Sequence, residues 1–221
     1  MKKTFAPIFA FLLAASAAVS VQAADVVPNA KAGEGKISLC IGCHGIPDYH
    51  ASFPQVYHVP EIGGQTASYI TDALKAYKAG DRKFPTMQAV AASLSDQDIA
   101  DIAAYYSEQN KPQAPATQPP APPAVQAILE KANCASCHGA NFSTPLAASM
   151  PKLAGQHADY LYAALKSYNA PDNAAFGRSN AVMGGVVKGN QLTHKEMQML
   201  ADYIGSLKGD VATVPEGRFK K

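Results

Sequence analysis

Apolar residues recur at three- and four-residue spacing in four stretches of the chain, and this spacing predicts amphipathic helices. Two of the stretches cover residues 66–78 and 157–168. The other two begin at Ser95 and Thr193, each followed three residues later by an acidic residue, which is typical of a capping box at a helix N-terminus. The positions expected to face the core behind these caps are Ile99, Ile102 and Tyr106, then Met197, Leu200, Ile204 and Leu207.

Two further helices are predicted over residues 31–44 and 125–138. No stretch shows the alternation of apolar and polar residues that is typical of a strand. Each half of the chain therefore has about three main helices. The pattern predicts an all-α fold.

The two halves are copies of one unit. Residues 59–65, VPEIGGQ, return as MPKLAGQ at residues 150–156, 91 positions later, and Tyr69 to Tyr77 returns at the same offset. Leu94 returns 98 positions later as Leu192. Because the offset changes only between blocks, the differences are loop insertions in a duplicated domain.

A proline-rich segment separates the copies. Residues 111–123 read KPQAPATQPPAPP, with six prolines in thirteen positions, which is typical of a semi-extended linker. We therefore place one domain at 24–110 and the other at 124–221. The first domain holds 6 basic and 10 acidic residues, and the second holds 10 basic and 7 acidic residues. This charge asymmetry could orient the molecule on its partners, or the charges could simply be ordinary solvated surface residues. The formal charge of +2 is too small to favour nucleic acid.

The N-terminus has the form of an export signal. Lys2 and Lys3 precede an apolar run at residues 5–21, and Val21-Gln22-Ala23 is a small-x-small cleavage motif. An uncleaved membrane anchor is the alternative, but the run is short and Pro7 interrupts it. We expect residues 1–23 to be a signal peptide that is removed.

All four cysteines lie in two C-x-x-C-H motifs, Cys40 to His44 and Cys134 to His138. On a helix the two thiols and the imidazole of one motif share a face, so the thiols can add across the two vinyl groups of a porphyrin while the imidazole reaches its iron. The motifs thus predict two covalent haem c groups, on Cys40 and Cys43 and on Cys134 and Cys137, with His44 and His138 as fifth iron ligands. A zinc ribbon would place its cysteine pairs 15 to 20 residues apart, whereas 90 residues separate these, and a thioredoxin-like site would need a βαβ unit.

The sixth iron ligands are expected to be Met87 and Met183. They follow their C-x-x-C-H histidines by 43 and 45 residues, and both lie in the loop ahead of the last helix of their domain. With both axial positions filled by protein the iron has no open site, so we expect an electron carrier, no catalytic residue and no enzyme activity. Histidine–methionine ligation raises the reduction potential relative to two histidines.

Other ligands fit the repeat less well. Met150 aligns with Val59, which cannot bind iron, and the remaining methionines of the second half lie on the last helix. Four histidines have no counterpart in the other copy and are interpreted as surface or loop residues, with His58 as the substitute if Met87 is not bound; they are His50, His58, His157 and His194.

With these motifs the chain resembles the class I c-type cytochromes, and in its whole layout the di-haem cytochrome c4 family. The resemblance covers nearly all of the chain after the signal peptide and implies two tandem class I cytochrome c domains. It also implies that the backbone carbonyls of Pro60 and Pro151 accept hydrogen bonds from the Nδ1 atoms of the haem histidines. The loops at 45–58 and 170–182 are longer than this pattern requires.

The resemblance implies a periplasmic one-electron carrier of a respiratory chain, between a quinol-oxidising complex or dehydrogenase and a terminal oxidase. Redox proteins are then the expected partners, and the carrier would work at the outer face of the cytoplasmic membrane. Two alternatives stay open: an electron-accepting subunit of a periplasmic dehydrogenase, and a di-haem peroxidase-type enzyme. A cysteine-ligated sulfur-oxidising site would need a fifth cysteine, and the chain has four.

Overall fold

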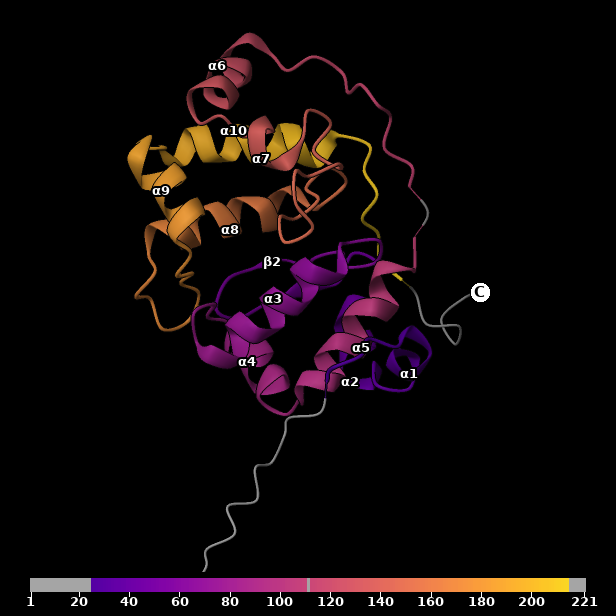
Figure 1. Ribbon diagram of the computed structural model, residues 1–221. Helices are drawn as coiled ribbons and strands as arrows, with labels where there is room; N and C mark the ends of the chain where they lie inside the picture. Colours follow the sequence, from indigo (N-terminus) through magenta and orange to yellow (C-terminus); the bar gives the residue numbers. More distant parts are fainter. Residues whose placement is uncertain (1–24, 111, 215–221) are drawn as a thin grey trace, which may run out of the picture.

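The computed structural model describes residues 25–110 and 112–214, and helices dominate this part of the chain. Figure 1 shows helices α1 to α5 gathered in one group and α6 to α10 in a second group stacked on it. The signal peptide predicted at residues 1–23 lies outside the described residues. The elements are α1 (Ala30–Glu34), α2 (Ser38–His44), β1 (His50–Ala51), β2 (Tyr57–His58), α3 (Ala67–Ala79), α4 (Pro85–Ala92), α5 (Asp96–Ser107), α6 (Pro123–Lys131), α7 (Ala135–His138), α8 (Ala158–Asn169), α9 (Ala181–Gly189) and α10 (His194–Ser206).

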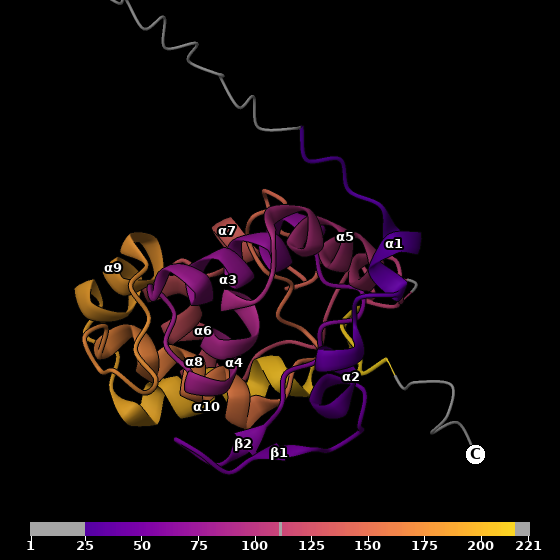
Figure 2. The same ribbon diagram turned by 90° about the horizontal axis from the view of Figure 1, so that it is seen from below.

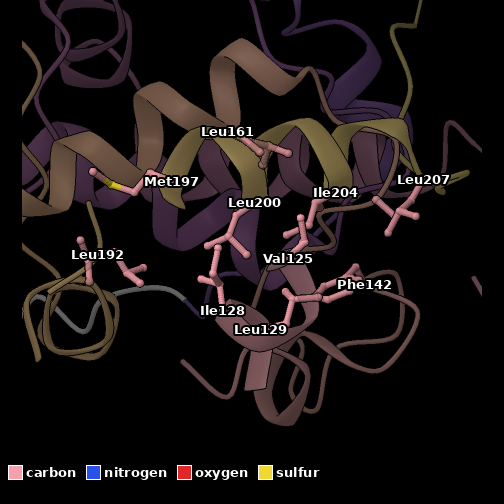
Figure 3. Packing of buried hydrophobic residues seen from close by; sticks show 13 residues of the cluster. Val125, Ile128, Leu129, Phe142, Leu161, Leu192, Met197, Leu200, Ile204 and Leu207 are labelled. Carbon is pink, nitrogen blue, oxygen red and sulfur yellow. The ribbon is translucent and has the colours of Figure 1, made fainter. Parts of the chain in front are cut away.

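The last helix of each domain begins at the predicted capping box. Ser95 and Thr193 each accept a hydrogen bond from the backbone N–H three residues on, and the acidic residue there accepts one in return. The predicted apolar stripes of α5 and α10 are buried. Figure 3 shows the α10 side chains packing against α6, α8 and the loop that carries Phe142. Helices α3 and α8 match their predicted ranges to within one residue.

Helix α1 crosses α5 at very short range. A Cβ added to Gly33 would lie 2.1 Å from the backbone oxygen of Asp101, so only glycine fits at this crossing. The side chain of Asp101 is 2 % exposed and accepts hydrogen bonds from the backbone N–H of Asn29 at 2.8 Å and from Lys36 Nζ at 2.7 Å. The carboxylate therefore joins both ends of α1 to α5.

The prediction of a single helix at the start of each domain is wrong, because two shorter helices stand there in both domains. Gly35 caps α1, and α2 starts only at Ser38. In the second domain α6 ends at Lys131, and Asn133 takes a left-handed conformation with φ of 50° before α7 begins. The C-x-x-C-H histidines thus lie on short separate helices.

The methionine segments, expected to be loops, form helices α4 and α9. Pro85 occupies the first turn of α4, where its missing N–H costs nothing, and the side chain of Asn180 caps α9 by accepting from Met183 N at 2.9 Å. The 45–58 loop holds a short antiparallel strand pair that was not predicted either. Figure 2 shows β1 and β2 at one edge of the molecule.

Two glutamines join the domains through reciprocal contacts. Gln65 donates to the carbonyl of Lys152 at 2.9 Å and accepts from its N–H at 2.9 Å. Its counterpart in the repeat, Gln156, does the same with Glu61, at 2.9 and 3.0 Å. The two domains therefore meet through equivalent surfaces, an arrangement typical of pseudo-twofold symmetry.

The segment between the domains lies against the second domain. The backbone N–H groups of Gln113 and Ala114 both donate to Asp210, at 2.7 Å each, and Tyr203 donates its hydroxyl to the carbonyl of Pro119 at 2.8 Å. These contacts hold an otherwise irregular, proline-rich stretch in place.

Candidate haem sites

The first C-x-x-C-H motif opens onto a cavity of about 330 Å³. Cys40, Cys43 and His44 of α2 line one side, and Met87 of α4 also reaches it. The apolar walls come from α3, from α5 and from the turn between α4 and α5. They include Ile70 and Leu74 of α3, Leu94 of that turn and Ile102 of α5. The structure thus brings together all four predicted site residues of this domain.

The histidine of each motif is oriented by a backbone carbonyl. Nδ1 of His44 lies 2.8 Å from the oxygen of Pro60, and Nδ1 of His138 lies 3.0 Å from that of Pro151. This confirms the hydrogen bonds expected from the family resemblance. Burial lowers the pKa of both imidazoles, so each ring is neutral, donates from Nδ1 and keeps the Nε2 lone pair available for a metal.

Met87 and Met183 occupy equivalent positions. Each is the third residue of its helix, α4 or α9. Met87 and Cys40 both pack against the buried core of the first domain. Helix α9 packs on α8 as α4 packs on α3, so the helices that carry the two methionines have equivalent neighbours.

An arginine–tyrosine cluster lies between the domains, and the sequence analysis missed it. Arg82 is buried and donates to Tyr69 Oη at 3.3 Å and to Tyr160 Oη at 2.5 Å, while Arg178 donates to Tyr160 Oη at 3.3 Å. Burial acts to raise the pKa of Tyr160, but the positive charges of Arg82 and Arg178 outweigh it and bring the pKa down to about 8.

A spacing shared by the two copies could have revealed this cluster. Arg82 stands five residues before Met87, and Arg178 stands five residues before Met183. The two arginines also pair with each other as an antiparallel β-bridge across the domain interface. The duplicated Arg-x-x-x-x-Met pattern was therefore the available signal.

These residues fit a haem. Arg82, Tyr69 and Tyr160 line the same cavity as Cys40 and His44. Within the described part of the chain, the buried Nε of Arg82 has no hydrogen-bond partner. A buried guanidinium with a free donor is suited to a carboxylate such as a haem propionate, and the apolar walls are suited to the porphyrin ring.

The comparisons with known proteins agree with this geometry. The family model for cytochrome c matches residues 31–109 and again residues 124–208. The chain belongs to the cytochrome c family, in its di-haem cytochrome c4 form. It is 30% identical over 200 residues to cytochrome c4 of Azotobacter vinelandii, covering 83% of this chain and 91% of the relative.

A solved structure shows the same architecture. Reduced recombinant cytochrome c4 from Pseudomonas stutzeri superposes with a TM-score of 0.60 at 28% identity, over 82% of this chain and 100% of that one. The chain is also 29% identical over 177 residues to a thiosulfate dehydrogenase electron acceptor of Stutzerimonas stutzeri, covering 76% of this chain and 78% of the relative.

The family assignment and the two cysteine pairs establish two covalently bound haem c groups and an electron carrier rather than an enzyme. The two tandem cytochrome c domains predicted from the sequence are confirmed. An electron carrier requires redox partners. In residues 25–110 and 112–214, no helix has both the length and the apolar character needed to cross a membrane.

Proposed function

We propose that this cytochrome is a periplasmic one-electron carrier of a respiratory chain. It would take electrons from a quinol-oxidising complex or a dehydrogenase and pass them to a terminal oxidase. The observation that carries the proposal is the cavity that gathers Cys40, Cys43, His44 and Met87 around one space. A site closed by two protein ligands suits electron transfer and leaves no position for a substrate.

The axial ligands in this proposal are His44 and Met87 for the first haem, and His138 and Met183 for the second. When bound, haem c supplies a one-electron iron couple. The carbonyls of Pro60 and Pro151 hold each imidazole in one orientation and raise its basicity as a ligand. The thioether ligand raises the reduction potential relative to a second histidine.

A redox titration of the holoprotein with optical and EPR detection tests the ligands. Met87→His and Met183→His should each lower the potential of one haem only, on the order of 100 mV within the ~0.8 V that axial ligands span. Met150→His is the matched control and should leave both potentials unchanged. A substitution at Met87 or Met183 that changes neither potential would show that the ligand at that haem is a different residue.

The closed state has its own signature. Both ferric haems should be low-spin with a methionine–iron charge-transfer band in the near infrared. Cyanide should bind the ferric protein, and carbon monoxide the ferrous protein, only slowly. A high-spin signal, or rapid cyanide binding to the untreated protein, would favour the peroxidase-type alternative instead.

The periplasmic location rests on the export signal at residues 1–23 and on the need to attach haem c outside the cytoplasm. N-terminal sequencing of the protein from the periplasmic fraction should start after Ala23. Recovery of a chain that still begins at residue 1 in the membrane fraction would contradict cleavage. Release from membranes by salt alone would indicate peripheral association.

A second candidate function is that of a dedicated electron acceptor for a periplasmic dehydrogenase. The similarity to a thiosulfate dehydrogenase electron acceptor favours it. Stopped-flow mixing separates the two candidate functions. If the protein is a respiratory carrier, the reduced cytochrome should be oxidised by membranes that contain a terminal oxidase. Rapid reduction by one co-purifying dehydrogenase, with no oxidation by such membranes, would support the dedicated acceptor.

A further inference from the structure

Two histidines face each other on the strand pair of the 45–58 loop. His50 of β1 is paired in register with His58 of β2, and their ring centroids are 3.7 Å apart. Neither has a counterpart in the second domain, because this loop is longer than the equivalent loop there. The pair is therefore a local addition to the duplicated unit.

A carboxylate of the other domain completes the cluster. Oδ2 of Asp159, in the first turn of α8, lies 2.8 Å from Nδ1 of His58 and accepts from its backbone N–H at 2.9 Å. The ligand atoms that His50, His58 and Asp159 can offer all lie within 4.8 Å of one another. His157 stacks on His58 with ring centroids 4.6 Å apart and closes one side of the cluster.

The hydrogen bonds of the two rings indicate which nitrogen of each can coordinate. Nδ1 of His50 lies 2.9 Å from the carbonyl oxygen of Asp48, which can only accept, so Nδ1 carries the proton and Nε2 keeps its lone pair. Nδ1 of His58 and Oδ2 of Asp159 face each other at 2.8 Å, so an ion shared by these two residues would be bound through these two atoms. The proton between them would move to Nε2 of the His58 ring when the ion binds.

We propose that His50, His58 and Asp159 bind one Zn²⁺ ion, with water completing the coordination. Two imidazoles and a carboxylate are donors that zinc prefers, whereas Mg²⁺ and Ca²⁺ prefer oxygen alone. Zinc–nitrogen bonds of about 2.0–2.1 Å require ligand atoms no more than about 4.2 Å apart. Because His50 is exposed, its ring can turn through the remaining distance.

The ion would join the two domains beside the first haem. His50 and Tyr57 of the strand pair line the same cavity as Cys40 and His44. Asp159 belongs to the second domain, so the coordination bonds would cross the interface. A divalent charge at this place disfavours the ferric form of the nearby haem, and Zn²⁺ should raise the potential of the first haem more than that of the second.

Isothermal titration of the oxidised holoprotein with Zn²⁺ in a non-chelating buffer at pH 7.5 tests the site. We expect one ion per chain, with affinity at least tenfold weaker in His50→Ala, in His58→Ala and in Asp159→Asn, because each change removes one ligand. His194→Ala is the matched control: this histidine lies on α10, its Nδ1 is 3.3 Å from Tyr162 Oη, and its loss should change nothing. Unchanged haem absorption spectra show that each variant has folded.

Two measurements can overturn the proposal. The absence of stoichiometric binding, equal binding in His50→Ala, or an equal loss in His194→Ala would each exclude this site. His50→Ala is decisive if His58→Ala fails to fold, because His50 is exposed and the one hydrogen bond of its ring within the described residues is to Asp48. In the second measurement, Zn²⁺ should raise the first haem potential in the wild type and leave it unchanged in His50→Ala. Because the binding titration involves no electron transfer, its result stands apart from the test of Met87 and Met183.

Discussion

Replacing Gln156 by alanine should loosen the interface between the domains. The side chain is 5 % exposed and accepts from the backbone N–H of Glu61 at 3.0 Å and of His157 at 3.1 Å, while it donates to the Glu61 carbonyl at 2.9 Å. Each such hydrogen bond contributes about 0.5–1.5 kcal/mol net. Because Glu61 is only partly buried and water can replace some of the loss, we expect about 2–4 kcal/mol of destabilisation.

Guanidinium chloride unfolding of the holoprotein, followed by far-ultraviolet circular dichroism, measures this loss as a lower midpoint. Gln156→Glu keeps the volume but cannot donate to the Glu61 carbonyl, so it separates the hydrogen bond from packing. Gln126→Ala is the control, because Gln126 is exposed and its side chain donates a hydrogen bond to Glu130 of the same helix. This change should lower the free energy of unfolding by less than about 0.5 kcal/mol.

Gln65→Ala should behave like Gln156→Ala, since Gln65 makes the same contacts with Lys152. The double variant should lose less than the sum of the two single losses, because both act on one interface. If Gln156→Ala is as stable as Gln126→Ala, the reciprocal contacts do not stabilise the pair of domains and the reasoning fails.

Two further predictions concern the crossing of α1 and α5. Gly33→Ala places a Cβ 2.1 Å from the backbone oxygen of Asp101 and should lower the free energy of unfolding, measured with denaturant, by about 1–3 kcal/mol or more. Gly189 has open space around it, so Gly189→Ala should be neutral or slightly stabilising. The hydrogen bond from Lys36 holds the pKa of Asp101 below its usual value, so this carboxylate stabilises the fold above about pH 4, and its contribution falls away as the pH drops through the lower folded pKa. Asp101→Asn should therefore lower the free energy of unfolding by about 1–3 kcal/mol at pH 7. Below about pH 4 the difference in stability from the wild type should shrink. Unfolding curves at pH 7, 5 and 3 measure this difference, and a difference that stays constant to pH 3 would contradict the prediction.

The features that the sequence could predict are those that depend on residues close together along the chain. A capping box joins positions three apart, such as Ser95 and Asp98, and a C-x-x-C-H motif spans five residues. Because the domain is duplicated, these patterns occur twice, and the methionines at similar distances from the two C-x-x-C-H motifs indicated Met87 and Met183 together. The breaks after α1 and α6 were missed, because a glycine cap at Gly35 and a left-handed Asn133 hardly alter the apolar spacing.

The sequence by itself thus determined an all-α, duplicated chain with two covalent haems, because thiol chemistry and helix periodicity are local. The contacts between the domains were decided only by the tertiary structure. Gln65 reaches Lys152, Arg82 reaches Tyr160, and His58 reaches Asp159 across separations of 78 to 101 residues. No periodicity encodes such pairs, since they depend on how two finished domains pack. The long 45–58 loop could be recognised as an insertion, but only folding against α8 turned its two histidines into a cluster with a carboxylate.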